Sequence, residues 1–255
     1  MPRSNWTREE LILAINLYCK IPFGRIHHRN KEVINLAKIL GRSPSAVSWK
    51  LVNFASLDPS LKKRGIKGAA NVSKLDKEIW NEFYNNWEKL SYESEVLLSK
   101  FTGQKLEDIS GIDTQELPKE GKVREAFIKV RVNQNFFRAA VLAAYDNKCA
   151  ITALPISELL VASHIVPWSK DEKNRLNPRN GICLNALHDK AFDKGLITIN
   201  KKYLILVSTK VKQLIKLETI QNYFLKFDNQ PVSLPSRFYP DQKFLEYHND
   251  IVFLR

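Results

Sequence analysis

One segment, residues 159–196, constrains the fold of this chain more than any other part of the sequence. It begins with a short apolar run, which predicts a strand that ends at Ser163 and His164 before a proline-containing loop. The turn dipeptide Asn180-Gly181 then precedes a second short apolar run and a helix-like stretch that Gly195 ends. The order strand, loop, strand and helix predicts a small ββα unit.

Three polar residues, His164, Asn180 and His188, stand at the junctions of this unit. A neutral histidine titrates near physiological pH, so a histidine at the end of a strand can take a proton from water. A second imidazole can hold a divalent ion through one ring nitrogen. A lone histidine on an apolar strand is usually structural, so it is the combined pattern that favours a site for catalysis.

The words SHIVPW, NGICLNALHD and FDKGLI resemble HNH nucleases of the ββα-metal superfamily, in the branch of bacterial predicted restriction endonucleases. The resemblance runs from about Val130 to about Ser208. It implies a metal-dependent DNA endonuclease that hydrolyses phosphodiester bonds, of the restriction type, with Mg²⁺ or Mn²⁺ as its cofactor. By the same resemblance His164 is the catalytic base, Asn180 ties the loop that positions it, and His188 binds the metal.

The metal site implied by this resemblance departs from the family pattern at one position. Many HNH enzymes have a metal-binding Asp or His directly before the base, whereas this chain has Ser163, whose hydroxyl is a weak ligand. Asp189 and Asp193 are the carboxylates near His188. We expect Asp193 to join His188 and Ser163 at the metal, although a turn residue that bonds local backbone is an equally good interpretation of Asp193.

Composition sets broader limits. A chain of 255 residues with 44% hydrophobic content can bury an ordinary core. Its apolar runs are shorter than a membrane span and its first residues lead directly into a helix, so we expect a cytoplasmic protein without a membrane partner. Cys19, Cys149 and Cys183 form no CxxC pair, so we expect neither a disulfide frame nor structural zinc.

The net charge of +13 is distributed unevenly. Residues 1–72 carry thirteen Lys/Arg against four Asp/Glu, residues 73–125 carry eight against twelve, and residues 126–255 carry nineteen against eleven. We therefore expect an α+β chain with a helical DNA-binding domain at 1–72, a helical connector and linker at 73–125, and a nuclease domain with a C-terminal extension at 126–255. Two basic blocks of this kind favour contact with a phosphate backbone.

The N-terminal block predicts helices to about Lys20, over about Lys31–Leu40 and from Ser43 onward, with Gly41 between the second and third. This helix-turn-helix outline and the phrase LAKILGRSPSAVSWKL resemble Myb/SANT-type or homeodomain-like three-helix domains. By that resemblance a DNA groove is contacted by residues on or near the outward face of the third helix, namely Ser45, Ser48, Trp49, Lys50 and Asn53. A packing domain with a solvated third helix is the alternative.

Other candidates for phosphate contact lie outside these helices. The expected basic loop Pro59–Ser73 contains Lys62, Lys63 and Arg64, and the expected helix Arg131–Tyr145 presents Arg131, Gln134 and Arg138. The remaining histidines have no partner pattern, and we interpret them as surface or local structural residues: His27, His28 and His248.

Double-stranded DNA is the expected substrate. One active site cuts one strand, so duplex cleavage predicts a homodimer. Two other functions stay open at this point. A non-catalytic DNA-binding regulator with a degenerate nuclease fold is favoured only by Ser163 at a usual ligand position, and a non-specific or RNA-cutting toxin-type nuclease is disfavoured by the N-terminal helical block.

Overall fold

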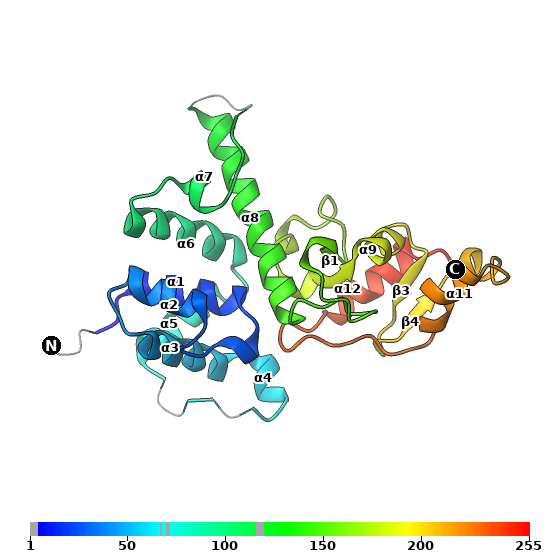
Figure 1. The fold of residues 1–255 in the computed structure, drawn as a ribbon, viewed down its shortest axis with the longest axis horizontal. Helices are drawn as coiled ribbons and strands as arrows, with labels where there is room; N and C mark the ends of the chain where they lie inside the picture. Colours follow the sequence, from blue (N-terminus) through cyan, green and yellow to red (C-terminus); the bar gives the residue numbers. More distant parts are fainter. Residues whose placement is uncertain (1–4, 67, 70–71, 116–119) are drawn as a thin grey trace. The chain divides into compact units, whose positions relative to one another are not determined.

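The computed structural model describes residues 5–66, 68–69, 72–115 and 120–255 (Figure 1). The chain divides into two compact units, 1–143 and 144–255. The first is helical, and the second combines two small antiparallel hairpins with short helices, so the expected α+β class is confirmed. Within the described residues, no helix is both long and apolar enough to cross a membrane.

The helices of the N-terminal unit follow one another in a simple order. They are α1 (Arg8–Lys20), η1 (Phe23–Arg25), α2 (Lys31–Ile39), α3 (Pro44–Leu57), α4 (Pro59–Lys63), α5 (Lys74–Phe83), α6 (Trp87–Thr102), α7 (Leu106–Ile109) and α8 (Lys122–Ala144), which leads to the boundary between the units.

Local sequence explains where these helices begin. Thr7 forms a capping box with Glu10 at the start of α1, and Asn30 and Ser43 accept hydrogen bonds from the first backbone N–H groups of α2 and α3. Gly41, with φ of +62°, makes the left-handed turn between α2 and α3.

Helix α1 is the centre of the N-terminal unit. Its residues 11–15 are fully or almost fully buried, because α3, α5 and α6 all pack against it. Residues of the expected connector therefore share a core with the first three helices. A fragment cut at residue 72 would separate α1 from two of its packing partners.

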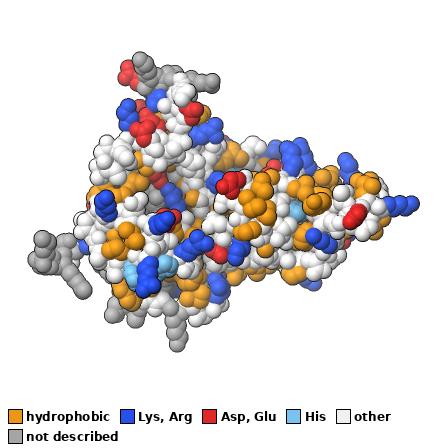
Figure 2. Space-filling view, in the orientation of Figure 1, with side chains coloured by type: hydrophobic (Ala, Val, Ile, Leu, Met, Phe, Trp, Pro, Cys, Tyr) orange, Lys and Arg blue, Asp and Glu red, His pale blue; other side chains and the backbone are white. Residues whose placement is uncertain are grey.

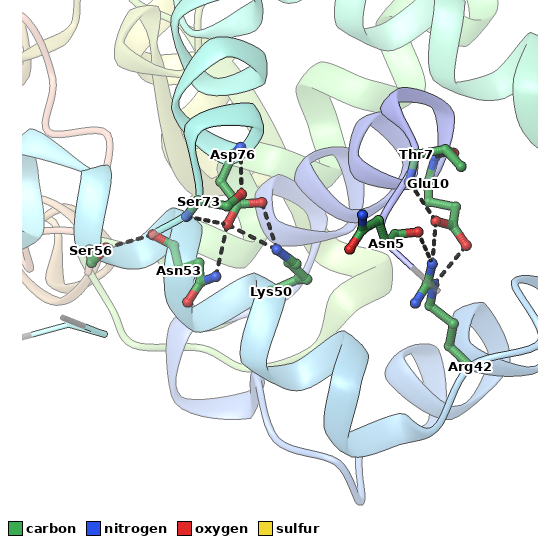
Figure 3. Close-up of polar contacts among 9 residues, drawn as sticks. All are labelled: Asn5, Thr7, Glu10, Arg42, Lys50, Asn53, Ser56, Ser73 and Asp76. Carbon is green, nitrogen blue, oxygen red and sulfur yellow. Dashed lines mark hydrogen bonds and ion pairs between the residues drawn. The ribbon is translucent and has the colours of Figure 1, made fainter. Parts of the chain in front are cut away.

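Ion pairs join the basic and acidic parts of this unit (Figure 3). Arg42 bonds both oxygens of Glu10 at 2.7 Å, and Lys50 Nζ lies 2.8 Å from Oδ1 of the fully buried Asp76. Other pairs run from α1 to α5 and α6: Arg8 with Glu82 and Glu93, and Lys20 with Glu95. Four cations of residues 1–72 are thus paired inside the unit: Arg8, Lys20, Arg42 and Lys50.

The C-terminal unit opens with the expected strand, loop, strand and helix. Strand β1 (Leu160–His164) pairs antiparallel with β2 (Gly181–Asn185), so that His164 stands opposite Gly181. Helix α9 (Ala186–Asp193) follows, capped by Asn185, and packs on both strands. The ββα prediction is confirmed.

The remaining elements cover this ββα unit. They are η2 (Ser157–Leu159), η3 (Glu172–Asn174), η4 (Pro178–Asn180), the hairpin of β3 (Ile197–Ile199) and β4 (Ile205–Val207), α10 (Thr209–Lys212), α11 (Glu218–Tyr223), η5 (Leu225–Phe227), α12 (Gln242–Tyr247) and the π-helix η6 (His248–Val252).

His248 fastens the C-terminal segment to α9. Its ring stacks on Phe192 with centroids 3.6 Å apart, and its two nitrogens lie 2.8 Å from Thr198 Oγ1 and 3.1 Å from the Phe192 carbonyl oxygen. Burial lowers the pKa of His248 to about 4. The histidine is therefore structural and neutral, and it is buried, not on the surface.

This burial predicts a pH-dependent stability. The unfolded chain binds a proton at His248 near pH 6.5, whereas the folded chain binds it only near pH 4, so stability is lost as the pH falls between these values. Protonation of His248 is expected to lower the free energy of unfolding by about 3 kcal/mol over this pH range. Urea unfolding measured from pH 7 to pH 4 should show a shallower pH dependence for His248→Gln than for the wild type. Equal slopes for the two proteins would contradict the prediction.

Candidate active site

His164 lies at the end of β1, half-buried. Its Nε2 is 2.9 Å from the Arg175 carbonyl oxygen, and because that oxygen can only accept, Nε2 donates and Nδ1 carries the lone pair of the neutral ring. Burial lowers the pKa of His164, while the bond to Arg175 and the negative charge of Asp189 act in the opposite direction. The ring is thus mainly neutral at pH 7, which is the form that accepts a proton.

Asn180 connects the two ends of the loop that follows β1. Its side chain is buried, with Oδ1 accepting from Val166 N at 2.8 Å and Nδ2 donating to the carbonyl oxygens of Val166 at 3.2 Å and Asn174 at 3.3 Å. Its backbone carbonyl also accepts from Ile165 N at 3.0 Å. The backbone directly after His164 is therefore fixed from the far side of the loop.

Trp168 and Arg175 close the same loop. The Trp168 ring meets the His164 ring edge-on at 5.5 Å, and the Arg175 guanidinium lies 5.4 Å from the Trp168 ring centre. Arg175 Nε donates to the Trp168 carbonyl oxygen at 2.8 Å. Because Arg175 also supplies the carbonyl that His164 bonds, these contacts set the orientation of the histidine ring.

His188, which was expected to bind the metal, lies on α9 with its ring buried. It is only 2% exposed, its ring lies between Phe224 and Phe227 at 5.7 and 5.6 Å, and its nitrogens are 3.0 Å from Asn185 Oδ1 and 2.8 Å from the Tyr223 carbonyl oxygen. Burial lowers its pKa. The neutral ring carries one N–H, so only one of these two contacts is a hydrogen bond, and the other nitrogen keeps its lone pair.

The next residue on α9, Asp189, is a further candidate metal ligand. Its charge acts on His164 and also on Asp193, one helical turn further along. Partial burial first, and then the charge of Asp189, raise the pKa of Asp193. Two carboxylates that repel each other on one helix face, with one of them near the base, form an arrangement that a cation would stabilise.

These residues fit a hard divalent ion with few protein ligands. Asp189 and Asp193 supply carboxylate oxygens, and Ser163 Oγ is buried without a hydrogen-bond partner among the described residues. The described part of the chain holds no ready cluster of three His, Cys, Asp or Glu side chains. Mg²⁺ suits such a place, because it is commonly held by one or two carboxylates and keeps several waters.

The candidate DNA-contacting residues of α3 divide into two groups. Ser45 and Trp49 are exposed, the latter by 65%. Lys50 and Asn53 are not available at the surface as expected, because Lys50 Nζ and Asn53 Nδ2 bond the carboxylate of Asp76 at 2.8 and 2.9 Å. Sequence analysis of α3 alone missed this, since Asp76 lies more than twenty residues further along the chain.

The candidates for phosphate contact outside α3 lie at the end of α4 and on α8. A loop was expected here, but Lys62 and Lys63 end the short helix α4. Both are exposed, as is Arg64. Residues 67, 70 and 71 of the expected loop lie outside the described residues. On α8, Arg131 donates to Gln134 at 3.0 Å, and Arg138 is exposed. Ser48 donates to the Ile26 carbonyl oxygen at 2.9 Å.

Comparison with known proteins identifies one region. Residues 149–200 match the family model described as HNH endonuclease. The matched region contains β1, β2, α9 and β3, and with them His164, Asn180, His188, Asp189 and Asp193. No curated protein matches the chain significantly.

Proposed function

Because residues 149–200 form an HNH endonuclease domain, of a family of phosphodiester hydrolases, we propose that this chain is a metal-dependent DNA endonuclease that acts in restriction. The observation that carries the proposal is the neutral His164 at the end of β1, with its loop fixed by Asn180 and the charge of Asp189 acting on its ring. A base, a fixed backbone and a nearby carboxylate are what hydrolysis of a phosphodiester requires.

In this mechanism His164 removes a proton from the attacking water. Nδ1 accepts the proton, because Nε2 already donates to the Arg175 carbonyl oxygen. The ring becomes positively charged, and the negative charge of Asp189 stabilises that form. Asn180 acts as a positioning residue, since its three side-chain bonds hold the backbone that follows His164.

The cofactor is proposed to be Mg²⁺ or Mn²⁺. When bound, such an ion neutralises charge on the scissile phosphate and on the departing 3′ oxygen. Asp189 would be the main ligand and Asp193 a second one, and Ser163 would be a weak further oxygen donor. His188 would support α9 through its ring contacts with Phe224 and Phe227 and through a single hydrogen bond to a protein oxygen.

DNA recognition is proposed for the helical N-terminal unit. Its α2 and α3, joined through Gly41, support a helix-turn-helix mode of binding. Cleavage of both strands would require a homodimer, since each chain supplies one His164.

Digestion of plasmid DNA tests the function. Wild-type protein with Mg²⁺ or Mn²⁺ is expected to cut plasmid into products with 5′ phosphates, and EDTA should abolish cutting, because the ion is needed at the phosphate. Mapped ends at a repeated sequence, with protection by base methylation, would support restriction. Binding without cleavage would favour the regulator, and cutting of RNA alone would favour the toxin-type nuclease.

A further inference from the structure

A basic loop projects from the N-terminal unit between α1 and α2. Two arginines and two histidines of this loop are exposed: Arg25, His27, His28 and Arg29. Figure 2 shows histidine and Lys/Arg side chains side by side on the surface of this unit. Residues 25–29 are called the basic loop below.

The basic loop has an ordered backbone. Ser48 of α3 donates to the Ile26 carbonyl oxygen at 2.9 Å, and Asn30 N donates to the His27 carbonyl oxygen at 3.0 Å. The Asn30 side chain then caps α2 by accepting from Glu32 N at 2.8 Å. Because the loop is bonded to α3 and to α2, its side chains are presented in place, and a ligand has less disorder to remove on binding.

Trp49 lies directly after Ser48, the residue that fastens the loop. It is 65% exposed, whereas Trp80 and Trp87 of the same unit are buried in its core. Ser45, one helical turn before Trp49, is exposed on the same face of α3. Ser48 thus links the helix that carries the exposed Trp49 to the loop that carries the exposed cations, and exposed cations are what phosphate contacts use.

Charge distribution also favours this surface. The cations of α1 and of the inner side of α3 are engaged with carboxylates of the unit, as the pairs of Arg8, Lys20 and Lys50 show. The cations of this unit that can attract an anionic partner therefore lie at its exterior, and Arg29 of the basic loop is one of them.

We propose that the basic loop and Trp49 form the surface through which the N-terminal unit contacts duplex DNA. Arg25 and Arg29 contact phosphates, while Ser45 and Trp49 face the groove. Duplex DNA fits this arrangement better than RNA, because a helix enters the wide major groove of B-form DNA, whereas that of A-form RNA is too narrow. This inference rests on the proposed function and deepens it.

Binding of the full chain to duplex DNA tests the proposal, measured by fluorescence anisotropy without divalent ions so that no cleavage occurs. Arg29→Glu is expected to weaken binding by roughly tenfold or more and to reduce the log–log salt slope by about one contact. Trp49→Ala should weaken binding to a similar degree while leaving the salt slope unchanged. Lys100→Glu, an equal change of charge at an exposed position near the end of α6, is the matched control and should change affinity about twofold at most.

The outcomes separate this surface from the proposed function. Wild-type affinity in both Arg29→Glu and Trp49→Ala, or an equal loss in Lys100→Glu, would overturn the surface while metal-dependent cleavage by the wild type still stood. Tighter binding of the wild type to RNA than to duplex DNA of the same sequence would also overturn it. A wild type that neither binds nor cuts DNA would remove the proposed function, and the surface with it. Unchanged thermal unfolding of the variants would show that they remain folded.

Discussion

His164→Ala is expected to lower the rate of DNA cleavage by roughly 10²–10⁴-fold, because the variant lacks the proposed base that takes a proton from water. Binding of DNA should change little, since the ring is half-buried and bonds the Arg175 carbonyl oxygen. Single-turnover cleavage with saturating Mg²⁺ measures the chemical step, and anisotropy without the ion measures binding.

Rescue by an external base distinguishes catalysis from support of the loop. Imidazole in the buffer is expected to restore part of the activity of His164→Ala, since a free base can enter the space left by the ring. It should leave Asn180→Ala unimproved, because that variant loses the bonds that hold Val166. Cleavage by His164→Ala at the wild-type rate would rule out the catalytic role.

Asp189→Asn is expected to reduce activity by about 10–100-fold at low Mg²⁺, because it removes the carboxylate proposed to hold the ion beside His164. Excess Mn²⁺ should restore part of the loss. Asp193→Asn should have a smaller effect, since the charge that acts on the His164 ring is that of Asp189. Titration of metal against cleavage rate measures both variants.

His188→Ala supplies the comparison for Asp189. The structure predicts loss of thermal stability for this variant, because the buried His188 ring loses its one hydrogen bond to a protein oxygen and its contacts with two phenylalanines. Its requirement for metal should remain close to that of the wild type. A large Mn²⁺-reversible defect in His188→Ala, together with a mild one in Asp189→Asn, would show that His188 and not Asp189 is the main metal ligand.

The ββα unit could be predicted from the sequence because its signals are local. Alternation and short apolar runs mark the two strands, Asn180-Gly181 marks the turn, and Asn185 caps the helix that follows. The positions of His164 and Asn180 at its junctions follow from the same signals. These features depend on neighbours only a few residues apart.

The direction of side chains on α9 could not be predicted in this way. Successive residues of a helix point about 100° apart, so choosing between His188 and Asp189 requires knowledge of what packs against each side. That information comes from Tyr223, Phe224 and Phe227, which belong to a distant segment. Lys50 was misplaced for the same reason, since its partner Asp76 belongs to another helix.

The pairing of Lys50 with Asp76 also bears on how this chain can evolve. Freeing Lys50 for a ligand leaves a fully buried carboxylate without its counter-charge, and the loss of one partner from such a pair costs about 3–5 kcal/mol. Mutations on the inner side of α3 that free Lys50 for a ligand therefore lower the stability of the fold. At His27, His28 and Arg29, which are exposed, sequence drift can alter the proposed binding surface while the core stays the same.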